Sequence, residues 1–280
     1  MTARAPALGW SVLLAAAFAA AAGPLSVQLG FAIVAVGGVG LAHGASDLAI
    51  VSPERRPAFL ALYALVTLVC LGWWIVAPAV ALPAFLLASA WHFGVEDTPA
   101  DRPVERLARG ISLVATPATL HAPALALLLT RAGVPGSVAP LFVGLLAVGG
   151  GVAAAGLVAL AVGRQDRRLL IGTIALLALP PLVGFSLGFL ILHALPQTVA
   201  RRIRLGCATT LAYLRATWPI LLAAAILVGG IGTVVLRADP SGVRSLFAGI
   251  AALAMPHLLV TPWFERPFPP PRRPARVGFG

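Results

Sequence analysis

Residues 26–48 read SVQLGFAIVAVGGVGLAHGASDL, a long apolar run that ends in His43 and Asp47. A membrane-spanning helix needs about 20 predominantly apolar residues, and this stretch approaches that length. Ionisable side chains inside a membrane are energetically expensive and usually mark a functional path or site. The stretch therefore predicts a transmembrane helix that carries chemistry at one end.

The rest of the chain has the same apolar character. Of its 280 residues, 60% are hydrophobic and 10% are charged, and the mean hydropathy is +0.97. Globular domains carry about 25% charged residues, so this composition excludes a soluble fold. The net charge of +11 comes from arginines in short clusters between apolar runs, which is typical of a membrane protein and indicates no nucleic-acid partner. The only two cysteines, Cys70 and Cys207, are far apart and exclude a cysteine-based metal site.

Apolar segments divide the chain into ten predicted helices. They cover residues 8–22, 26–42, 57–77, 80–94, 106–122, 138–162, 167–180, 182–200, 216–236 and 243–260. The predicted fold is all-α, a polytopic transmembrane bundle of about 8–10 spanning helices in one domain over residues 1–265. Residues 266–280 form a basic, proline-rich tail that we expect to be cytoplasmic. Residues 1–22 also fit a cleaved signal peptide, because Arg4 precedes an alanine-rich end.

Two consecutive prolines, Pro180 and Pro181, decide the topology. They cannot lie inside one helix, because each removes a backbone donor and clashes with the preceding turn. A turn at this point places both termini on the same side of the membrane. Seventeen of the twenty arginines then lie on that side, which the positive-inside rule identifies as the cytoplasm.

In this topology four of the five histidines lie at one depth. His43, His92, His193 and His257 occupy the inner halves of four helices that run in the same direction. His121 falls instead near the outer end of its segment, between Pro117 and Pro123. A single intramembrane histidine is more often a hydrogen-bond partner between helices than a ligand. Four at matching depth favour a metal or cofactor site.

An all-imidazole set suits iron, zinc, copper or nickel rather than magnesium or calcium. Metal-bound histidines need acceptors for their second ring nitrogen. Asp47, four residues after His43, is the predicted partner of that histidine, and Glu96 stands in the same relation to His92. Gln197, four residues after His193, is a candidate weak ligand, outer partner or substrate contact.

Four aromatic residues close to the histidines in sequence fit either ordinary packing or a wall for a substrate: Trp91, Phe93, Phe185 and Phe189.

These motifs resemble the Brp/Blh family of bacterial and archaeal membrane proteins, the β-carotene 15,15′-dioxygenases that form retinal. The segment His43-Gly-Ala-Ser-Asp47 is similar to the family's PHGAxD element, with Ala42 in place of the proline. Similar elements are Trp91-His92-Phe93-Gly94, Pro180-Pro181 with Phe185 and His193, Met255-Pro256-His257, and the loop Leu120-His121-Ala122-Pro123.

The resemblance implies a multi-pass protein of the bacterial plasma membrane with an Fe(2+) centre held by His43, His92, His193 and His257. It also implies O2 as co-substrate and central cleavage of β-carotene or a related carotenoid to retinal. One departure concerns the third element, which usually carries two histidines four residues apart, whereas this chain has Gln197 at the second position. We expect His257 to complete the ligand set.

Two alternatives remain open from the sequence. A membrane desaturase or hydroxylase is disfavoured, because such enzymes typically carry clusters with eight or more histidines in total and this chain has five histidines. A non-catalytic or altered-specificity carotenoid-binding or transport protein, with a histidine metal or haem site, is the second alternative. Zinc in place of iron is not excluded by the residues themselves.

Overall fold

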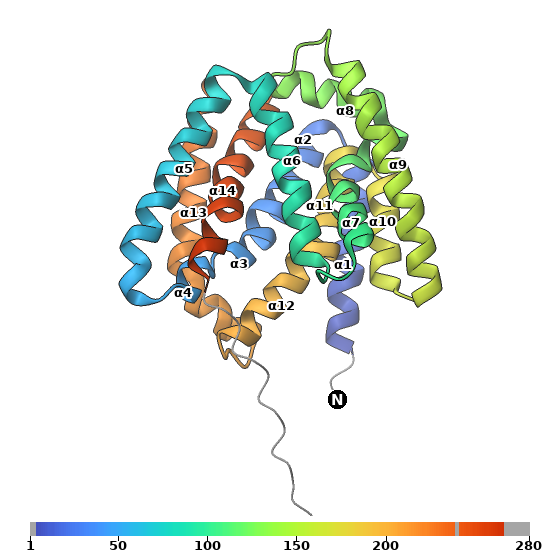
Figure 1. The fold of residues 1–280 in the computed structure, drawn as a ribbon. Helices are drawn as coiled ribbons and strands as arrows, with labels where there is room; N and C mark the ends of the chain where they lie inside the picture. Colours follow the sequence, from blue (N-terminus) through green and yellow to red (C-terminus); the bar gives the residue numbers. More distant parts are fainter. Residues whose placement is uncertain (1–3, 239–240, 266–280) are drawn as a thin grey trace, which may run out of the picture.

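The computed structural model describes residues 4–238 and 241–265, which form helices and contain no β-strand (Figure 1). The elements are α1 (Arg4–Ala21), α2 (Leu25–Ala32), π-helix η1 (Ile33–Gly40), α3 (Leu41–Gly44), α4 (Asp47–Ile50), 3-10 helix η2 (Pro53–Arg55), α5 (Arg56–Val76), α6 (Pro78–Asp97), α7 (Pro103–Ala115), α8 (Pro117–Ala132), α9 (Ala139–Arg164), α10 (Arg167–Ala178), α11 (Pro181–Phe189), π-helix η3 (Leu190–Ala194), α12 (Leu195–Arg204), α13 (Thr210–Ala238) and α14 (Val243–Phe264).

Eight helical stretches within the described ranges are long and apolar enough to cross a membrane. They are Leu25–Ile50, Pro53–Val76, Pro78–Asp97, Pro103–Ala132, Ala139–Arg164, Pro181–Arg204, Thr210–Leu227 and Val243–Phe264. The two other predicted helices, α1 and α10, have 18 and 12 residues. The all-α, multi-pass bundle predicted from the sequence is thus confirmed.

Prolines set many of the helix boundaries. A proline occupies one of the first two positions of α5, α6, α7, α8, α9 and α11, where its missing N–H costs no intrahelical bond. The predicted turn at Pro180–Pro181 is confirmed, since α10 ends at Ala178 and α11 begins at Pro181. The helices before and after this turn run in opposite directions.

The predicted helix over residues 106–122 is wrong in its end. The structure divides this part of the chain at Thr116 into α7 and α8, and α8 continues to Ala132. His121 has non-helical backbone angles (φ −127°, ψ 34°), so α8 is kinked there. Pro123 removes one backbone donor, but the chain resumes its helical course after the kink instead of turning.

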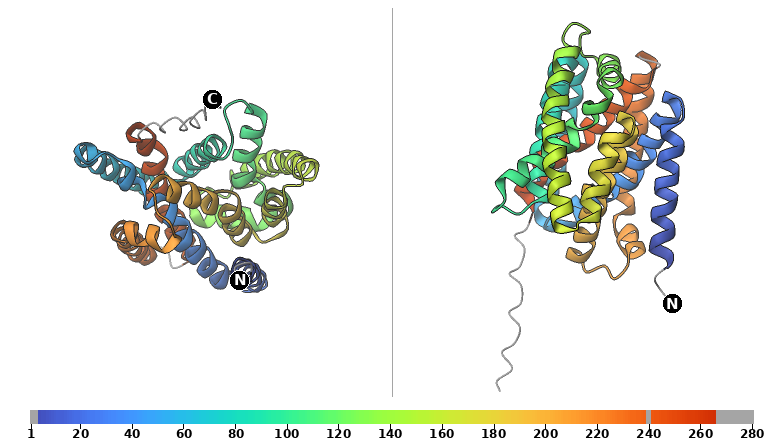
Figure 2. Two further views of the ribbon diagram at one scale, coloured as in Figure 1. Left: turned by 90° about the horizontal axis from the view of Figure 1, so that it is seen from below. Right: turned by 90° about the vertical axis from the view of Figure 1, so that its right-hand side faces the viewer.

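The four histidine-bearing stretches run in the same direction through the bundle (Figure 1). These stretches are α2–α3, α6, α11–α12 and α14, each passing from the upper to the lower end in this view. Figure 2 shows the same arrangement along the bundle axis and from the side. All four histidines therefore lie in the part of each stretch that approaches the lower end.

Arginine-rich helix ends gather at this same end of the bundle. The start of α5, the turn between α9 and α10 and the end of α12 lie there, as does the beginning of α1 (Figure 1). Glu105 of α7 ties two of the helices together by accepting from Arg109 and from Arg164 of α9, both at 2.8 Å. That this end faces the cytoplasm stays a prediction, and the tail over 266–280 lies outside the described residues.

A close contact between α6 and α7 fixes the end of α6. A Cβ atom on Gly94 would lie 2.5 Å from the backbone oxygen of Arg106, so only glycine fits there. Gly44, by contrast, would meet only Nδ1 of His257 at 4.0 Å, an ordinary contact. The approach at Gly94 sets the depth at which α6 presents His92.

Candidate metal centre

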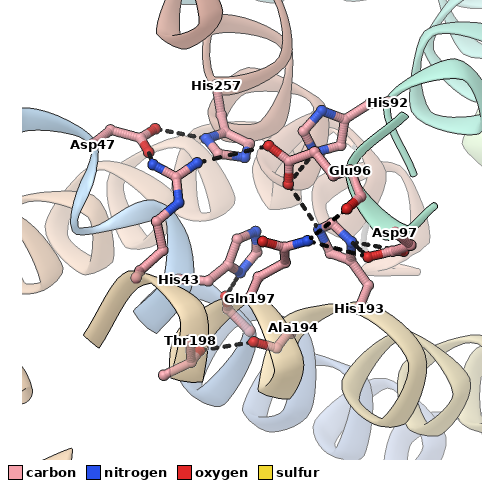
Figure 3. Close-up of polar contacts among 12 residues, drawn as sticks. His43, Asp47, His92, Glu96, Asp97, His193, Ala194, Gln197, Thr198 and His257 are labelled. Atoms are coloured by element: carbon pink, nitrogen blue, oxygen red, sulfur yellow. Dashed lines mark hydrogen bonds and ion pairs between the residues drawn. The ribbon is translucent and has the colours of Figure 1, made fainter. Parts of the chain in front are cut away.

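Four imidazoles from four different stretches form a closed ring in the bundle. Neighbouring ring centroids are separated by 5.1 Å (His43–His193), 5.4 Å (His193–His92), 5.1 Å (His92–His257) and 5.3 Å (His257–His43). None of the four residues is more than 8% exposed, and His193 is completely buried. We call these four residues the histidine ring (Figure 3).

Irregular helix geometry positions two of the four histidines. His43 follows the π-helix η1, and His193 lies within the π-helix η3. π-Helical turns are rare and often occur at functional sites, because the wider turn changes the direction of the side chains that follow it. In this chain both turns lie next to the ring.

A proline positions His257 on α14. Pro256 has no N–H, so the carbonyl of Ala252 loses its partner within the helix. Thr67 of α5 donates to that carbonyl at 3.2 Å, and Tyr63 donates to the next one, at Leu253, at 3.1 Å. α5 thus satisfies the backbone of α14 one turn before the histidine.

The outward nitrogens of three ring members are held by oxygen acceptors. Nδ1 of His257 donates to Asp47 at 2.6 Å, and Nδ1 of His193 donates to the carboxylate of Asp97 at 3.0 Å. Nδ1 of His43 donates to the backbone carbonyl of Gly40. A hydrogen bond of this kind fixes the tautomer of each ring and leaves Nε2 with a lone pair.

The inward nitrogens lack partners. Nε2 of His92, His193 and His257 is buried and has no hydrogen-bond partner among the described residues. Buried polar atoms in native proteins are almost always satisfied, so each such atom requires an explanation. Nε2 of His193 and of His257 each lies opposite an Nδ1 that is held by a carboxylate. Together with the unpartnered Nε2 of the buried His92, these atoms have the donor chemistry of a metal site.

Glu96 adds a carboxylate to this donor set. Its Oε2 atom lies 3.5 Å from Nε2 of His92 and 4.0 Å from Nε2 of His193. The possible ligand atoms of these three residues all lie within 4.8 Å of one another. The sequence suggested Glu96 as an outer partner of His92, but the structure places it on the inward side of the ring.

A large apolar cavity adjoins the histidine ring. Its volume is about 910 Å³, and all four histidines contribute to its wall. Most of the other wall residues are aliphatic or aromatic and come from α2, η1, α5, α6, α13 and α14. Sites for small organic molecules are typically largely apolar with a few convergent polar groups, and this cavity has that character.

Residues 34–265 match the family model described as Beta-carotene 15,15'-dioxygenase. The chain belongs to this family. The matched range includes the whole histidine ring and most of the cavity wall. No curated protein and no solved structure shows significant similarity to the chain.

The family description names a dioxygenase of β-carotene. This description agrees with a site that is polar at the histidine ring and apolar along the rest of the cavity wall.

Three of the aromatic residues singled out in the sequence lie beside the histidine ring. Phe93 lies 4.7 Å from the ring of His193, and Phe189 lies 6.0 Å from that of His43. Phe185 stacks on Phe189 at 5.8 Å, and all three line the cavity.

Trp91 and His121 lie elsewhere. Trp91 is 74% exposed and does not line the cavity, so its suggested role at the site is wrong. Successive helical residues differ by about 100° in direction, and α6 turns His92 and Phe93 inward and Trp91 outward. His121 is outside the histidine ring, as the sequence predicted, on the kinked helix α8.

The predicted partnership between Asp47 and His43 is wrong. Asp47 accepts from Nδ1 of His257 instead, and also from Thr261 at 2.9 Å. The prediction assumed one continuous helix, in which residues four apart share a face. The helix is broken between Gly44 and Asp47, and this break turns the carboxylate towards α14.

Two residues at the site were missed in the sequence. Asp97 holds His193, and Arg201 carries a buried guanidinium that is 3.6 Å from both Asp47 and Glu96 and 2.7 Å from Glu265. Arg201 follows His193 by eight residues, about two helical turns, so the helical period could have indicated it. The arginine balances the carboxylates around the ring, which would otherwise repel one another in a medium of low dielectric constant.

Gln197 is the residue that the family resemblance marks as a departure, at the position where it implies a second histidine. Its amide donates to Oδ1 of Asp97 at 3.2 Å and to the backbone oxygen of Glu96 at 3.3 Å (Figure 3). Asp97 in turn accepts from His193. Gln197 therefore fixes the carboxylate that orients one of the ring histidines.

Proposed function

We propose that this protein cleaves β-carotene, or a related carotenoid, at its central double bond with O2 to form retinal. We also propose that it does so in the bacterial plasma membrane. The observation that carries the proposal is the ring of four buried histidines at the wall of an apolar cavity, three of which have unpartnered Nε2 atoms among the described residues. Membership of the β-carotene 15,15′-dioxygenase family supports the substrate class and the reaction type.

The residues fit an iron centre. We propose that His43, His92, His193 and His257 hold Fe(2+) through Nε2, with Glu96 near enough to serve as a further ligand. Imidazole nitrogens with a carboxylate are donors that iron accepts readily, and the carboxylate-bound Nδ1 atoms of His193 and His257 make their rings stronger ligands. The bound iron would supply the activation of O2 that an organic side chain cannot provide.

The balance of the reaction agrees with the character of the cavity. One C=C bond and one O=O bond are broken, and two C=O bonds form, so that one C40 polyene and one O2 give two C20 aldehydes. No proton is gained or lost overall. The cavity wall accordingly needs no acid–base pair, and its aliphatic and aromatic side chains exclude water and hold the polyene in position.

The aromatic side chains beside the ring have a positioning role in this proposal. Phe93 and Phe189 lie against the imidazoles, and Phe185 extends this row along the cavity. Flat rings favour offset or edge contacts with another π-system. They would orient the conjugated chain so that its central bond faces the metal.

The deciding experiment is expression in cells that make β-carotene. We expect the cells to lose their carotene colour and accumulate retinal, and the purified protein to contain iron. Cells carrying the empty vector are the control. Purified protein that binds carotenoid and forms no retinal would support the binding or transport alternative, and iron-free protein with unchanged carotene would refute the proposal.

A leucine at position 197 tests the role that we assign to Gln197, which is to hold the carboxylate of Asp97 in place beside His193. The Gln197→Leu variant keeps a similar volume and loses both amide donors, so Asp97 holds His193 less firmly. We expect iron retention during dialysis against a chelator to fall by several-fold, less than the about 10- to 100-fold typical of a direct partner of a ligand. Unchanged retention would show that the amide contributes nothing to the centre.

A further inference from the structure

The cavity extends well beyond the histidine ring, beneath α13. This helix packs mainly on α14 and touches α3 and α12 near its beginning. Of the eight candidate spans, its stretch Thr210–Leu227 has the smallest buried share, 11%. Seven residues of α13 line the cavity: Pro219, Ile220, Ala223, Ala224, Leu227, Gly229 and Thr233. α13 is thus the outer wall of the cavity.

One side of this wall is open towards α5. Leu60, Ala64 and Leu68 follow one another at intervals of four residues, so they form a single stripe on α5. All three line the cavity, yet Leu60 is 51% exposed and Leu68 is 66% exposed. A side chain that both lines a cavity and is more than half exposed lies at its mouth. This stripe is inside the span Pro53–Val76, so the mouth opens to lipid.

The other side of the wall is open towards η1. Ile33 lines the cavity and is 53% exposed, and its neighbours Leu29 and Gly37 line it as well. These residues belong to the span Leu25–Ile50, so this mouth also opens to lipid. The cavity wall continues along the same stretch from Gly37 through Gly40 to His43. From the α5 mouth, Tyr63 and Thr67 line the cavity and donate to the backbone of α14 one turn before His257. The wall thus leads to the histidine ring from both mouths.

We propose that the cavity is a two-ended channel in which a carotenoid lies beneath α13, with one half directed to the α5 mouth and the other to the η1 mouth. This inference builds on the proposed function. A polyene is a stiff, apolar rod that dissolves in lipid, so a channel open to the bilayer at both ends can receive it without a soluble carrier. Cleavage at the centre requires room for two equal halves on either side of the reacting bond.

Tryptophan at each mouth tests the channel. Ala64→Trp narrows the α5 mouth, and Gly37→Trp narrows the η1 mouth, where a Cβ atom meets nothing within 4 Å. The matched controls are Ala61→Trp and Gly38→Trp, which add the same bulk to exposed neighbours that do not line the cavity. We expect each mouth variant to form retinal at least about tenfold more slowly than its control, because misplacing a reacting group by about 1 Å can cost about a hundredfold. Iron content should be equal in all four.

The outcomes separate this inference from the proposed function. Rates equal to those of the controls in both mouth variants would overturn the channel, and a loss at one mouth alone would overturn its two-ended form. If the wild-type protein forms no retinal, the carotenoid bound per molecule of purified protein, measured by visible absorbance, decides in its place. Less bound carotenoid in both mouth variants than in the controls supports the channel, and equal amounts refute it.

Discussion

We expect the His193→Ala variant to lose its iron and its retinal-forming activity together. His193 is completely buried, two ring neighbours lie within 5.4 Å of it, and its Nε2 atom has no hydrogen-bond partner among the described residues. Removal of an outer partner alone typically costs about 10- to 100-fold in metal affinity, so removal of a ligand should cost more than about a hundredfold. Elemental analysis of the purified protein and chromatographic assay of retinal measure the two losses.

His121 provides the matched control for this prediction. The His121→Ala variant removes the same side chain from a helix outside the histidine ring, so iron content and activity should stay close to those of the wild type. If His193→Ala retained iron at the wild-type level, the ring would not be the metal centre. If His121→Ala lost iron to the same degree, the loss would reflect general damage to the fold.

The second large effect concerns Asp47. Its carboxylate accepts from Nδ1 of His257 at 2.6 Å and lies 3.6 Å from the guanidinium of Arg201, and only 2% of the residue is exposed. Asparagine has the same shape but no charge, so it orients His257 less firmly and makes it a poorer ligand. We expect Asp47→Asn to weaken iron binding about 10- to 100-fold, measured by competition with a chelator.

A variant of Thr261 separates the role of the Asp47 charge from that of the hydrogen bonds around it. It donates to the same carboxylate oxygen at 2.9 Å, and Thr261→Val removes that hydrogen bond while keeping the volume. Iron binding should change much less in this variant than in Asp47→Asn. Equal losses in the two would mean that the local hydrogen-bond network as a whole, and not the charge beside His257, determines iron affinity.

Apolar runs and prolines in the sequence were sufficient to predict the helical bundle and the direction of its histidine-bearing helices. Apolar runs of spanning length predicted the bundle, and Pro180 with Pro181 predicted the reversal that makes all four histidine-bearing stretches run the same way. Both rules depend on the chain alone, because backbone groups in lipid must be satisfied within helices and proline lacks a donor. The common depth of His43, His92, His193 and His257 follows from that topology, and the structure places the four side chains in one ring.

Side-chain partners across the bundle depended on the tertiary structure. Asp47 serves His257, which is 210 residues away in the chain, because the break after Gly44 rotates it out of the face of His43. Asp97 and Arg201 reach the ring only through the packing of α6 against η3 and α12. The length and direction of each helix set the depth of its residues, so the amino-acid sequence is enough to predict which of them lie level with the histidine ring. Which of these residues touch depends on the rotation of each helix about its axis, and that rotation is set by packing against the neighbouring helices.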